Sequence, residues 1–141
     1  MAPTNDCEGN RTSEKIIALQ GASETDIDNA VAAARTAFEG PWSDLAAVER
    51  GDFLYRIAEL LQRDKELLAA IEAFDNGKPY SVALAEDLGE SYNVFKYYAG
   101  AADKISGRTI ETSPAKLAYV LQEPLGVCGQ IIPWYVGILF I

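Results

Sequence analysis

The sequence predicts an α/β fold, of which this chain holds the helical beginning and the first strands. Apolar residues recur at helical spacing over most of the chain before Gly107, and the period then changes to two. The helices are followed by strands without β-α-β alternation. A parallel sheet needs several strands joined by crossovers, and this chain supplies too few of them. Residues 127–141 carry no charge, and a segment this apolar needs a covering layer on each side. We therefore expect a fragment of a larger α/β fold.

Composition indicates a folded globular chain with an acidic surface. Of the 141 residues, 49% are hydrophobic, which is too many for a disordered chain and enough for one domain with a core. The formal net charge of −9 argues against a nucleic-acid partner, because phosphates attract basic faces, and equally against an anionic membrane surface. We interpret the acidic surface as a solubility feature.

The cysteine and histidine content argues against a metal site and against a histidine-based catalytic triad. There is no histidine, and the two cysteines, Cys7 and Cys128, lack the spacing of metal ligands. The polar N-terminal residues do not form a signal peptide, so we expect a cytoplasmic, thiol-reducing location. The apolar C-terminal run is interrupted by Gly129, Gln130 and Pro133, so we do not expect it to span a membrane.

The first helix is predicted from its capping residues and from one apolar stripe. Ser23 and Thr25 are candidate N-caps, and acidic residues follow them at the positive end of the helix. The stripe has spacings of four, three and four residues and consists of Ile27, Val31, Ala34 and Phe38. Gly40 and the proline after it are expected to end this helix.

Three more helices are predicted from similar signals. The second begins near Ser43 and Asp44, and the third is capped by Asp64 and ends at Gly77, which precedes a Lys-Pro pair. The fourth and longest spans residues 81–104, over which apolar residues keep helical spacing. Together these helices account for most of the chain before residue 107.

The strand predictions rest on runs of apolar residues with a period of two or with no polar interruption. A short strand is expected at 15–19, after a polar lead-in over residues 1–13. Leu117, Tyr119 and Leu121 alternate with their neighbours, which is typical of a strand with one buried face. Residues 127–132 carry no charge and are mostly apolar, which predicts a strand buried on both faces.

Several segments resemble aldehyde dehydrogenases, in the order in which that family carries them. They are AAARTAF at 32–38, Trp42, ERG at 49–51, DNGKP at 75–79, YYAGAADKI at 97–105 and EPLGVCGQIIPW at 123–134. The likeness covers residues 14–134 and is greatest to the broad-specificity and retinal-type branch, which includes fungal enzymes. Each segment alone is a helix face or a turn, and their common order and matching gaps carry the resemblance.

The resemblance implies a map of the chain onto the aldehyde dehydrogenase fold. Residues 1–108 would be the N-terminal helical part of the cofactor-binding domain, and 109–126 the hairpin of the oligomerisation arm. Residues 127–134 would return as the first core strand of the cofactor-binding domain, and 135–141 would be a divergent apolar tail. The parent enzymes oxidise an aldehyde to a carboxylic acid with NAD or NADP, and they assemble through the arm into homo-oligomers.

The resemblance assigns cofactor contacts but no catalytic residue to this chain. Ile132, Pro133 and Trp134 would form a wall of the cofactor site, although as isolated residues they would be plain core. The catalytic cysteine and glutamate of the family lie beyond residue 141, and no metal ligand is implied. Cys7 lies in the polar lead-in, and Cys128 is expected in a buried strand, where apolar surroundings raise the pKa of a thiol. Both cysteines are therefore interpreted as structural or inert.

The similarity ends abruptly at Tyr135. In the family an asparagine occupies that position, and its amide helps to hold the oxyanion that forms when a thiolate attacks the aldehyde. A sharp loss of similarity is typical of a splicing or gene-model boundary or of a premature stop. This is one reason to expect a truncated N-terminal fragment that is inactive alone.

Other patterns have ordinary explanations. Glu86, Asp87 and Glu90 could form an acid–base pair, but a solvated helix face is the simpler interpretation. Lys78 lacks the glycine-rich loop of a phosphate site and is interpreted as part of a helix end. The GVCG segment at 126–129 has the wrong spacing for a dinucleotide fingerprint.

Two functions remain open at this point. The chain is either the N-terminal portion of an NAD(P)-dependent aldehyde dehydrogenase or a non-catalytic remnant that docks on full-length relatives through the arm hairpin.

Overall fold

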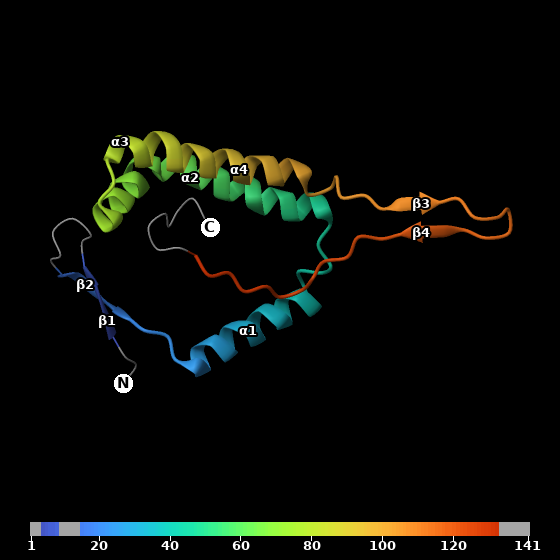
Figure 1. Cartoon of the computed structure of the whole chain (residues 1–141), viewed down its shortest axis with the longest axis horizontal. Helices are drawn as coiled ribbons and strands as arrows, with labels where there is room; N and C mark the ends of the chain where they lie inside the picture. The colour runs from blue at the N-terminus through green and yellow to red at the C-terminus, as the bar shows by residue number, and fades with distance from the viewer. Residues whose placement is uncertain (1–3, 9–14, 133–141) are drawn as a thin grey trace.

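A pair of long helices dominates the computed structural model, which describes residues 4–8 and 15–132. Helix α2 (Ala47–Asn76) and helix α4 (Leu88–Ala101) lie side by side (Figure 1). The short helix α3 (Tyr80–Val82) and the π-helical turn η1 (Ala83–Asp87) lead from one into the other. This helical unit contains the buried apolar residues of the described chain.

The core is a thin seam of small side chains between these helices. Its fully or nearly buried apolar members are Ala58, Ala69, Ala83 and Leu88. Leu61, Leu68 and Leu84 pack around them and stay partly exposed. A Cβ atom built on Gly51 would lie 2.7 Å from the carbonyl oxygen of Ala99. The two backbones approach so closely because small residues line the contact.

Helix α1 (Glu24–Glu39) forms as its sequence predicts. Its N-cap is a reciprocal capping box, in which the Asp26 backbone N–H donates to Ser23 Oγ at 3.3 Å and the Ser23 backbone N–H donates to Asp26 Oδ2 at 2.8 Å. Gly40 ends the helix, as expected. The apolar stripe is uncovered, because Ile27 and Val31 are 57% and 47% exposed.

Helix α2 corrects the prediction of two separate helices. It runs for 30 residues without interruption and is capped at Ala46, whose N–H donates to Glu49 Oε2 at 2.8 Å. Asp64 does not cap a helix but pairs with Arg63. Good helix formers and the absence of proline within these residues explain the continuity. The end at Gly77 is confirmed, since this residue has a φ of 78° that favours glycine.

The predicted helix over 81–104 is present but is not uniform. Its first part is α3 and the π-helical turn η1, in which the Leu88 N–H donates to the Ala83 carbonyl five residues earlier. Such a turn inserts one residue into a helix and rotates the side chains before it relative to those after it. Helix α4 then ends at Ala101, three residues before the predicted end.

The strands form two antiparallel hairpins. Strand β1 (Thr4–Glu8) pairs with strand β2 (Lys15–Gln20), as Thr4 lies opposite Gln20. The sequence predicts β2 and misses β1, because residues 1–13 show no apolar alternation. Strand β3 (Arg108–Ile110) pairs with strand β4 (Ala118–Val120), and this hairpin projects away from the helices (Figure 1).

The β3–β4 hairpin lies in the segment expected to be an arm, but neither face of it is deeply buried. Leu117, Tyr119 and Leu121 are 79%, 60% and 66% exposed, so the predicted buried face is uncovered in this chain. At its base, a Cβ on Gly107 would lie 1.8 Å from the Val120 carbonyl oxygen. Glycine is therefore needed where the two strands meet.

The prediction of a buried strand over residues 127–132 is wrong for this chain. The structure assigns no strand to 121–132, and Ile131 is 97% exposed. A strand needs a partner for its backbone groups, and no described strand lies beside this segment.

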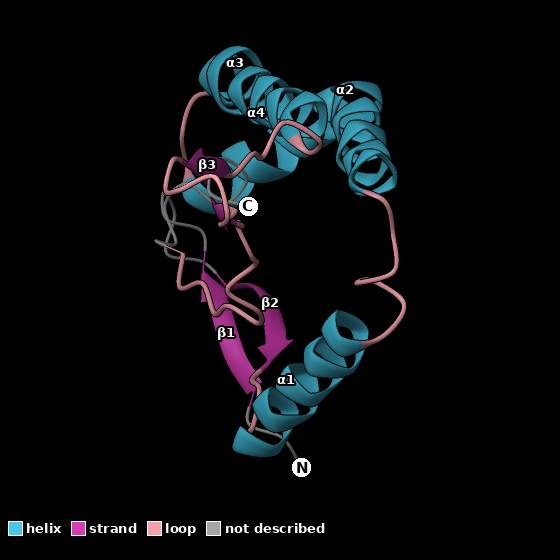
Figure 2. Ribbon diagram, turned by 90° about the vertical axis from the view of Figure 1, so that its right-hand side faces the viewer, coloured by secondary structure: helices cyan, strands magenta, loops and turns pink. Residues whose placement is uncertain are grey.

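The elements lie around the periphery of the molecule. Figure 2 shows α1 and the β1–β2 hairpin placed apart from the α2–α4 pair. The accessible surface is 11220 Å², whereas a compact protein of 15.3 kDa exposes about 7,100 Å². In the described part of the chain, no helix is long and apolar enough to cross a membrane.

Candidate functional site

The residues predicted to contact a cofactor lie at the edge of what the structure describes. Ile132 is half-buried, and Pro133 and Trp134 fall outside the described residues, as does Tyr135. The segment before them passes helix α1. A Cβ on Gly126, whose φ is 103°, would lie 3.8 Å from Arg35 Nη1.

Cys128 does not have the environment that the sequence suggests. Its side chain is exposed, and its S–H donates to the Gly126 carbonyl at 3.6 Å. The expected burial in a strand is therefore wrong, because the strand is absent. Cys7 lies in β1 opposite Ile17, so part of the polar lead-in forms a strand of a hairpin. A backbone carbonyl is not a base that could activate the Cys128 thiol as a nucleophile.

A buried ionic cluster joins the end of α2 to the π-helical turn. Glu72 and Asp87 are each 6% exposed, and the Lys78 ammonium lies between them. Lys78 Nζ is 3.7 Å from Glu72 Oε1 and pairs directly with Asp87 Oδ2. Asn76 extends the cluster, since its Nδ2 donates to Glu72 Oε1 at 2.6 Å and its Oδ1 accepts from the Lys78 backbone N–H at 2.9 Å.

The cluster corrects two expectations from the sequence. Asp87 was predicted on a solvated face, but it is buried and paired, while Glu86 and Glu90 are exposed as predicted. Lys78 lies directly after the C-cap Gly77, as expected, and its ammonium also forms ion pairs with two carboxylates. Sequence reasoning missed Glu72. Its position four residues before Asn76 was the signal that could have found it, because residues at that spacing share a helix face.

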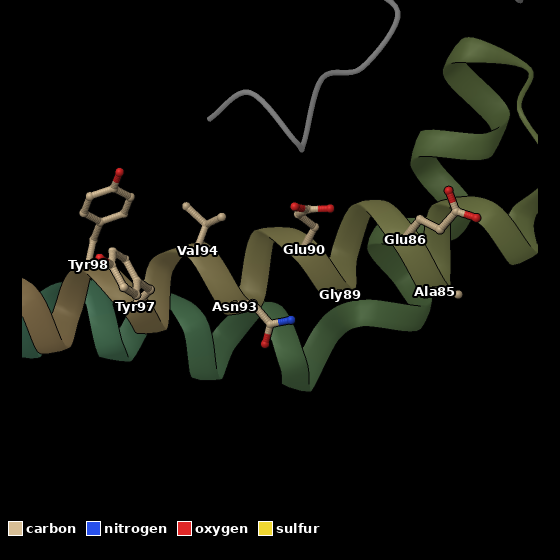
Figure 3. Close-up of a pocket in the computed structure, with 8 residues that line it drawn as sticks. All are labelled: Ala85, Glu86, Gly89, Glu90, Asn93, Val94, Tyr97 and Tyr98. Carbon is tan, nitrogen blue, oxygen red and sulfur yellow. The ribbon is translucent and has the colours of Figure 1, made fainter.

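A shallow hollow of about 730 Å³ follows the outer face of α4 and its preceding turn. It is lined by Ala85, Glu86, Gly89, Glu90, Asn93, Val94, Tyr97 and Tyr98 (Figure 3). The two tyrosine rings meet edge to face with centroids 5.2 Å apart. All of these residues belong to one stretch of the chain, so the hollow is the exposed side of one helix.

The described residues do not assemble a catalytic centre. They include no group of three or more histidine, cysteine, aspartate or glutamate side chains that could hold a metal ion. In the buried cluster both carboxylates pair with the same ammonium, and the α4 hollow offers exposed carboxylates without a nucleophile beside them.

Comparison with known proteins decides the family. The sequence model described as "Aldehyde dehydrogenase family" matches residues 4–141. The chain belongs to the aldehyde dehydrogenase family. An aldehyde dehydrogenase of Emericella nidulans is 52% identical over 126 residues, which are 89% of this chain and 25% of the relative. The mitochondrial aldehyde dehydrogenase of Rattus norvegicus is 46% identical over 125 residues, which are 87% of this chain and 24% of the relative.

The fold agrees with solved aldehyde dehydrogenases over nearly the whole chain. The NAD⁺ complex of the Bacillus cereus enzyme superposes with a TM-score of 0.94 at 43% identity, covering 97% of this chain and 28% of that one. The aldehyde dehydrogenase KauB of Pseudomonas aeruginosa gives 0.92 at 35% identity. The predicted partial aldehyde dehydrogenase fold is therefore confirmed. The chain spans about a quarter of the length of these aldehyde dehydrogenases.

Proposed function

We propose that the complete protein to which these residues correspond oxidises an aldehyde to a carboxylic acid with NAD or NADP. The observation that carries this proposal is the agreement with the NAD⁺ complex of the Bacillus cereus enzyme, at a TM-score of 0.94 and 43% identity. Because the chain spans about a quarter of its relatives, the activity is proposed for a polypeptide that also holds the rest of the fold.

The proposed part of this chain in that reaction is structural support and one wall of the cofactor site. Ile132, Pro133 and Trp134 are apolar and can pack against a flat ring, but they supply no ligand for a phosphate. The bound nicotinamide would supply the hydride acceptor. Attack on the aldehyde, its activation and hydrolysis of the thioester require a thiolate and a base, which this chain does not place together.

The isolated 141-residue chain is expected not to oxidise aldehydes. It lacks an assembled nucleophile and base, and one apolar wall does not make a preformed cofactor pocket. The measurement is the absorbance of reduced cofactor during incubation with NAD or NADP and short, long and aromatic aldehydes. Turnover above a buffer blank that survives repurification would contradict this expectation, as would saturable NAD binding in the micromolar range by calorimetry.

A chimera tests the proposed function of the complete protein. Residues 4–134 of this chain would replace the matching segment of the Emericella nidulans enzyme, with which it shares 52% identity. We expect NAD(P)-dependent aldehyde oxidation, and a Trp134→Ala version should raise the KM for the cofactor more than it lowers kcat. A folded chimera without activity would refute the proposal that this segment supports dehydrogenase chemistry.

The tyrosine at position 135 allows a second comparison in the same chimera. Extending the graft to Tyr135 replaces the asparagine whose amide helps to hold the oxyanion in the family. Losing one such donor costs about 10²–10³ in kcat. Tyr135→Asn should restore the activity of the shorter graft.

Assembly and location follow as proposals from the same family membership. Ile110, Leu117 and Tyr119 make the β3–β4 hairpin an exposed apolar arm, which supports homo-oligomerisation through it. The same exposure favours the alternative function, a non-catalytic module that docks on full-length relatives. Cytoplasmic location stays a proposal, and some relatives are named as mitochondrial enzymes.

The alternative can be tested with the arm alone changed. A Leu117→Asp, Tyr119→Asp variant should stop co-purification of the chain with a full-length relative if docking uses the hairpin. Unchanged co-purification would exclude docking through this hairpin.

A further inference from the structure

Asn76, the last residue of α2, is followed directly by Gly77, and this is the only asparagine–glycine pair in the sequence. The backbone nitrogen of the residue after an asparagine can attack the side-chain carbonyl carbon. The cyclic imide that results forms most readily when this next residue has no Cβ atom in the way. The pair therefore holds both reacting groups of a deamidation, a peptide nitrogen and an amide carbon.

A backbone hydrogen bond prepares the Asn76 side chain for such an attack. Asn76 Oδ1 accepts from the Lys78 backbone N–H at 2.9 Å. A donor in this position can stabilise the negative charge that develops on the oxygen when a nucleophile adds to the carbon. Gly77 is exposed to the solvent that must take up the proton of its peptide nitrogen.

The end of α2 holds the nucleophile away from this carbon. The Gly77 N–H donates to the Ala73 carbonyl at 3.0 Å. Ring closure needs Asn76 Cβ and the Gly77 nitrogen on the same side of the Cα–C bond, and a helical ψ of about −42° keeps them apart. Asn76 Nδ2 also donates to Glu72 Oε1 at 2.6 Å. The first hydrogen bond must break before the ring closes, and the second must break before ammonia leaves.

The ionic cluster of Glu72, Lys78 and Asp87 opposes the opening of this helix end. Both carboxylates are 6% exposed, and both pair with the Lys78 ammonium. Opening residues 73–78 takes the ammonium away from two buried carboxylates, which costs free energy. Segments open locally with a free energy set by such contacts, and a reaction that needs the open form follows its population. The cluster therefore controls how often Asn76 can react.

We propose that Asn76 is a covalent modification site, at which spontaneous deamidation is controlled by the ionic cluster at the end of α2. When this end opens, the Gly77 nitrogen loses its proton to solvent and bonds to Asn76 Cγ. The Cγ–Nδ2 bond then breaks, and the leaving nitrogen takes up a proton and departs as ammonia. Water opens the imide at either of its carbonyl groups and leaves aspartate or isoaspartate at position 76.

The product prevents the end of α2 from closing as before. A carboxylate would replace the amide that donates to Glu72, so three carboxylates would face the single Lys78 ammonium. Like charges at hydrogen-bond distance repel each other. Isoaspartate also adds a carbon atom to the main chain, which interrupts helical hydrogen bonding. One opening event that ends in deamidation thus becomes a permanent change.

The site is tested by peptide mass spectrometry of the full 141-residue chain during incubation in a mildly alkaline buffer. Asn76 should deamidate ahead of Asn29 and Asn93, which lie within helices and precede residues with a Cβ atom. It should react faster in concentrated urea than in native buffer, because urea opens the end of α2. Failure of Asn76 to react first, or equal rates in urea and in native buffer, overturns the proposal.

Lys78→Met tests the control by the cluster, since it removes the ammonium and keeps the backbone N–H. In native buffer we expect this variant to deamidate at Asn76 roughly tenfold faster or more. Lys104→Met is the matched control and should leave the rate unchanged, because its ion pair with Asp103 is exposed. In concentrated urea both variants should react at the rate of the wild type. No acceleration by Lys78→Met, or equal acceleration by both variants, overturns the proposed control.

The wild type alone decides the question if Lys78→Met does not fold. At low urea concentrations its deamidation rate at Asn76 should rise in parallel with hydrogen exchange of the Gly77 amide, because both need the same opening. A deamidation rate that stays constant while this exchange accelerates would refute control by opening of the helix end.

Discussion

At the residue scale, Gly51 sets the distance between α2 and α4. A Cβ atom at this position would lie 2.7 Å from the Ala99 carbonyl oxygen and 3.3 Å from Ala102 Cβ. Neither neighbour is the flexible end of a side chain, so the helices themselves must move. We expect Gly51→Ala to lower the free energy of unfolding by about 1–3 kcal/mol, as overpacking does elsewhere. Urea unfolding followed by circular dichroism measures the change.

Gly100 provides the control for this substitution. It lies in α4, and a Cβ there meets nothing within 4 Å. Gly100→Ala should stabilise the chain by about 0.5–1 kcal/mol, because alanine loses less backbone entropy in a helix. Equal effects of the two substitutions would show that helix propensity, and not the interhelical distance, governs this contact.

Lys78 is the second residue whose role can be measured directly. Its ammonium forms ion pairs with both Glu72 and Asp87, which are each 6% exposed. Lys78→Met would leave two buried carboxylates without a positively charged partner, and we expect a loss of about 3–5 kcal/mol in the free energy of unfolding. Lys104→Met is the control, because its ion pair with Asp103 is exposed and should contribute little. A small effect of Lys78→Met would mean that water reaches these carboxylates.

The sequence predicts individual residues well where their role is local. Ser23 as a cap and Gly77 as a helix end depend on neighbours three or four residues away, and both are confirmed. Asp87 depends on Lys78, nine residues earlier, across a turn and a π-helical insertion. Helical spacing alone places Asp87 on a solvated face, so its burial could not be derived. The proposed wall of the cofactor site came from family resemblance and remains a prediction.

At the element scale, the cap of α1 makes that helix sensitive to pH. Hydrogen bonds from the Ser23 backbone and side chain lower the pKa of Asp26 below its ordinary value. A carboxyl with a lower pKa in the folded state stabilises it above the unfolded pKa, and this contribution is lost as pH falls through the folded pKa. We therefore expect α1 to fray below about pH 4 in amide hydrogen exchange.

Ser23→Ala separates this cap from general acid effects. The variant should weaken α1 at neutral pH by about 1 kcal/mol, typical of a lost N-cap. It should keep the larger part of the pH dependence, because the Ser23 backbone N–H, which lowers the pKa of Asp26 most, is also present in alanine. If α1 is as stable in the variant as in the wild type at neutral pH, the side chain of Ser23 does not control this end of the helix.

The sequence predicts most helices and strands as the correct type of element. It does not predict all of their ends or the segments with which they pair. The capping signal at Asp64 suggests a new helix where α2 is continuous, since capping residues also occur inside helices when packing holds the chain. The residues 127–132 have the composition of a buried strand but no neighbour to pair with. A strand forms only when a second segment supplies backbone hydrogen bonds to it, so the composition of one segment is not enough to predict a strand.

At the scale of the whole molecule, the chain exposes apolar surface, as we expect of a part of a larger fold. The apolar stripes predicted on α1 and α2 are present, yet large members such as Ile27 and Leu67 stay exposed. Sequence periodicity identifies faces that need cover without stating what covers them. Solved relatives share this arrangement over 28% of their length.

The shortage of buried surface predicts weak cooperativity of unfolding. The urea m-value is proportional to the area that unfolding exposes. The folded chain already has 11220 Å² of accessible surface. Its unfolding therefore newly exposes only about three quarters of the area that unfolding of a compact 15.3 kDa protein would expose. We therefore expect an m-value near three quarters of the usual one for this length. A full-sized m-value for the isolated chain would mean that the exposed stripes of α1 and α2 pack on each other in solution.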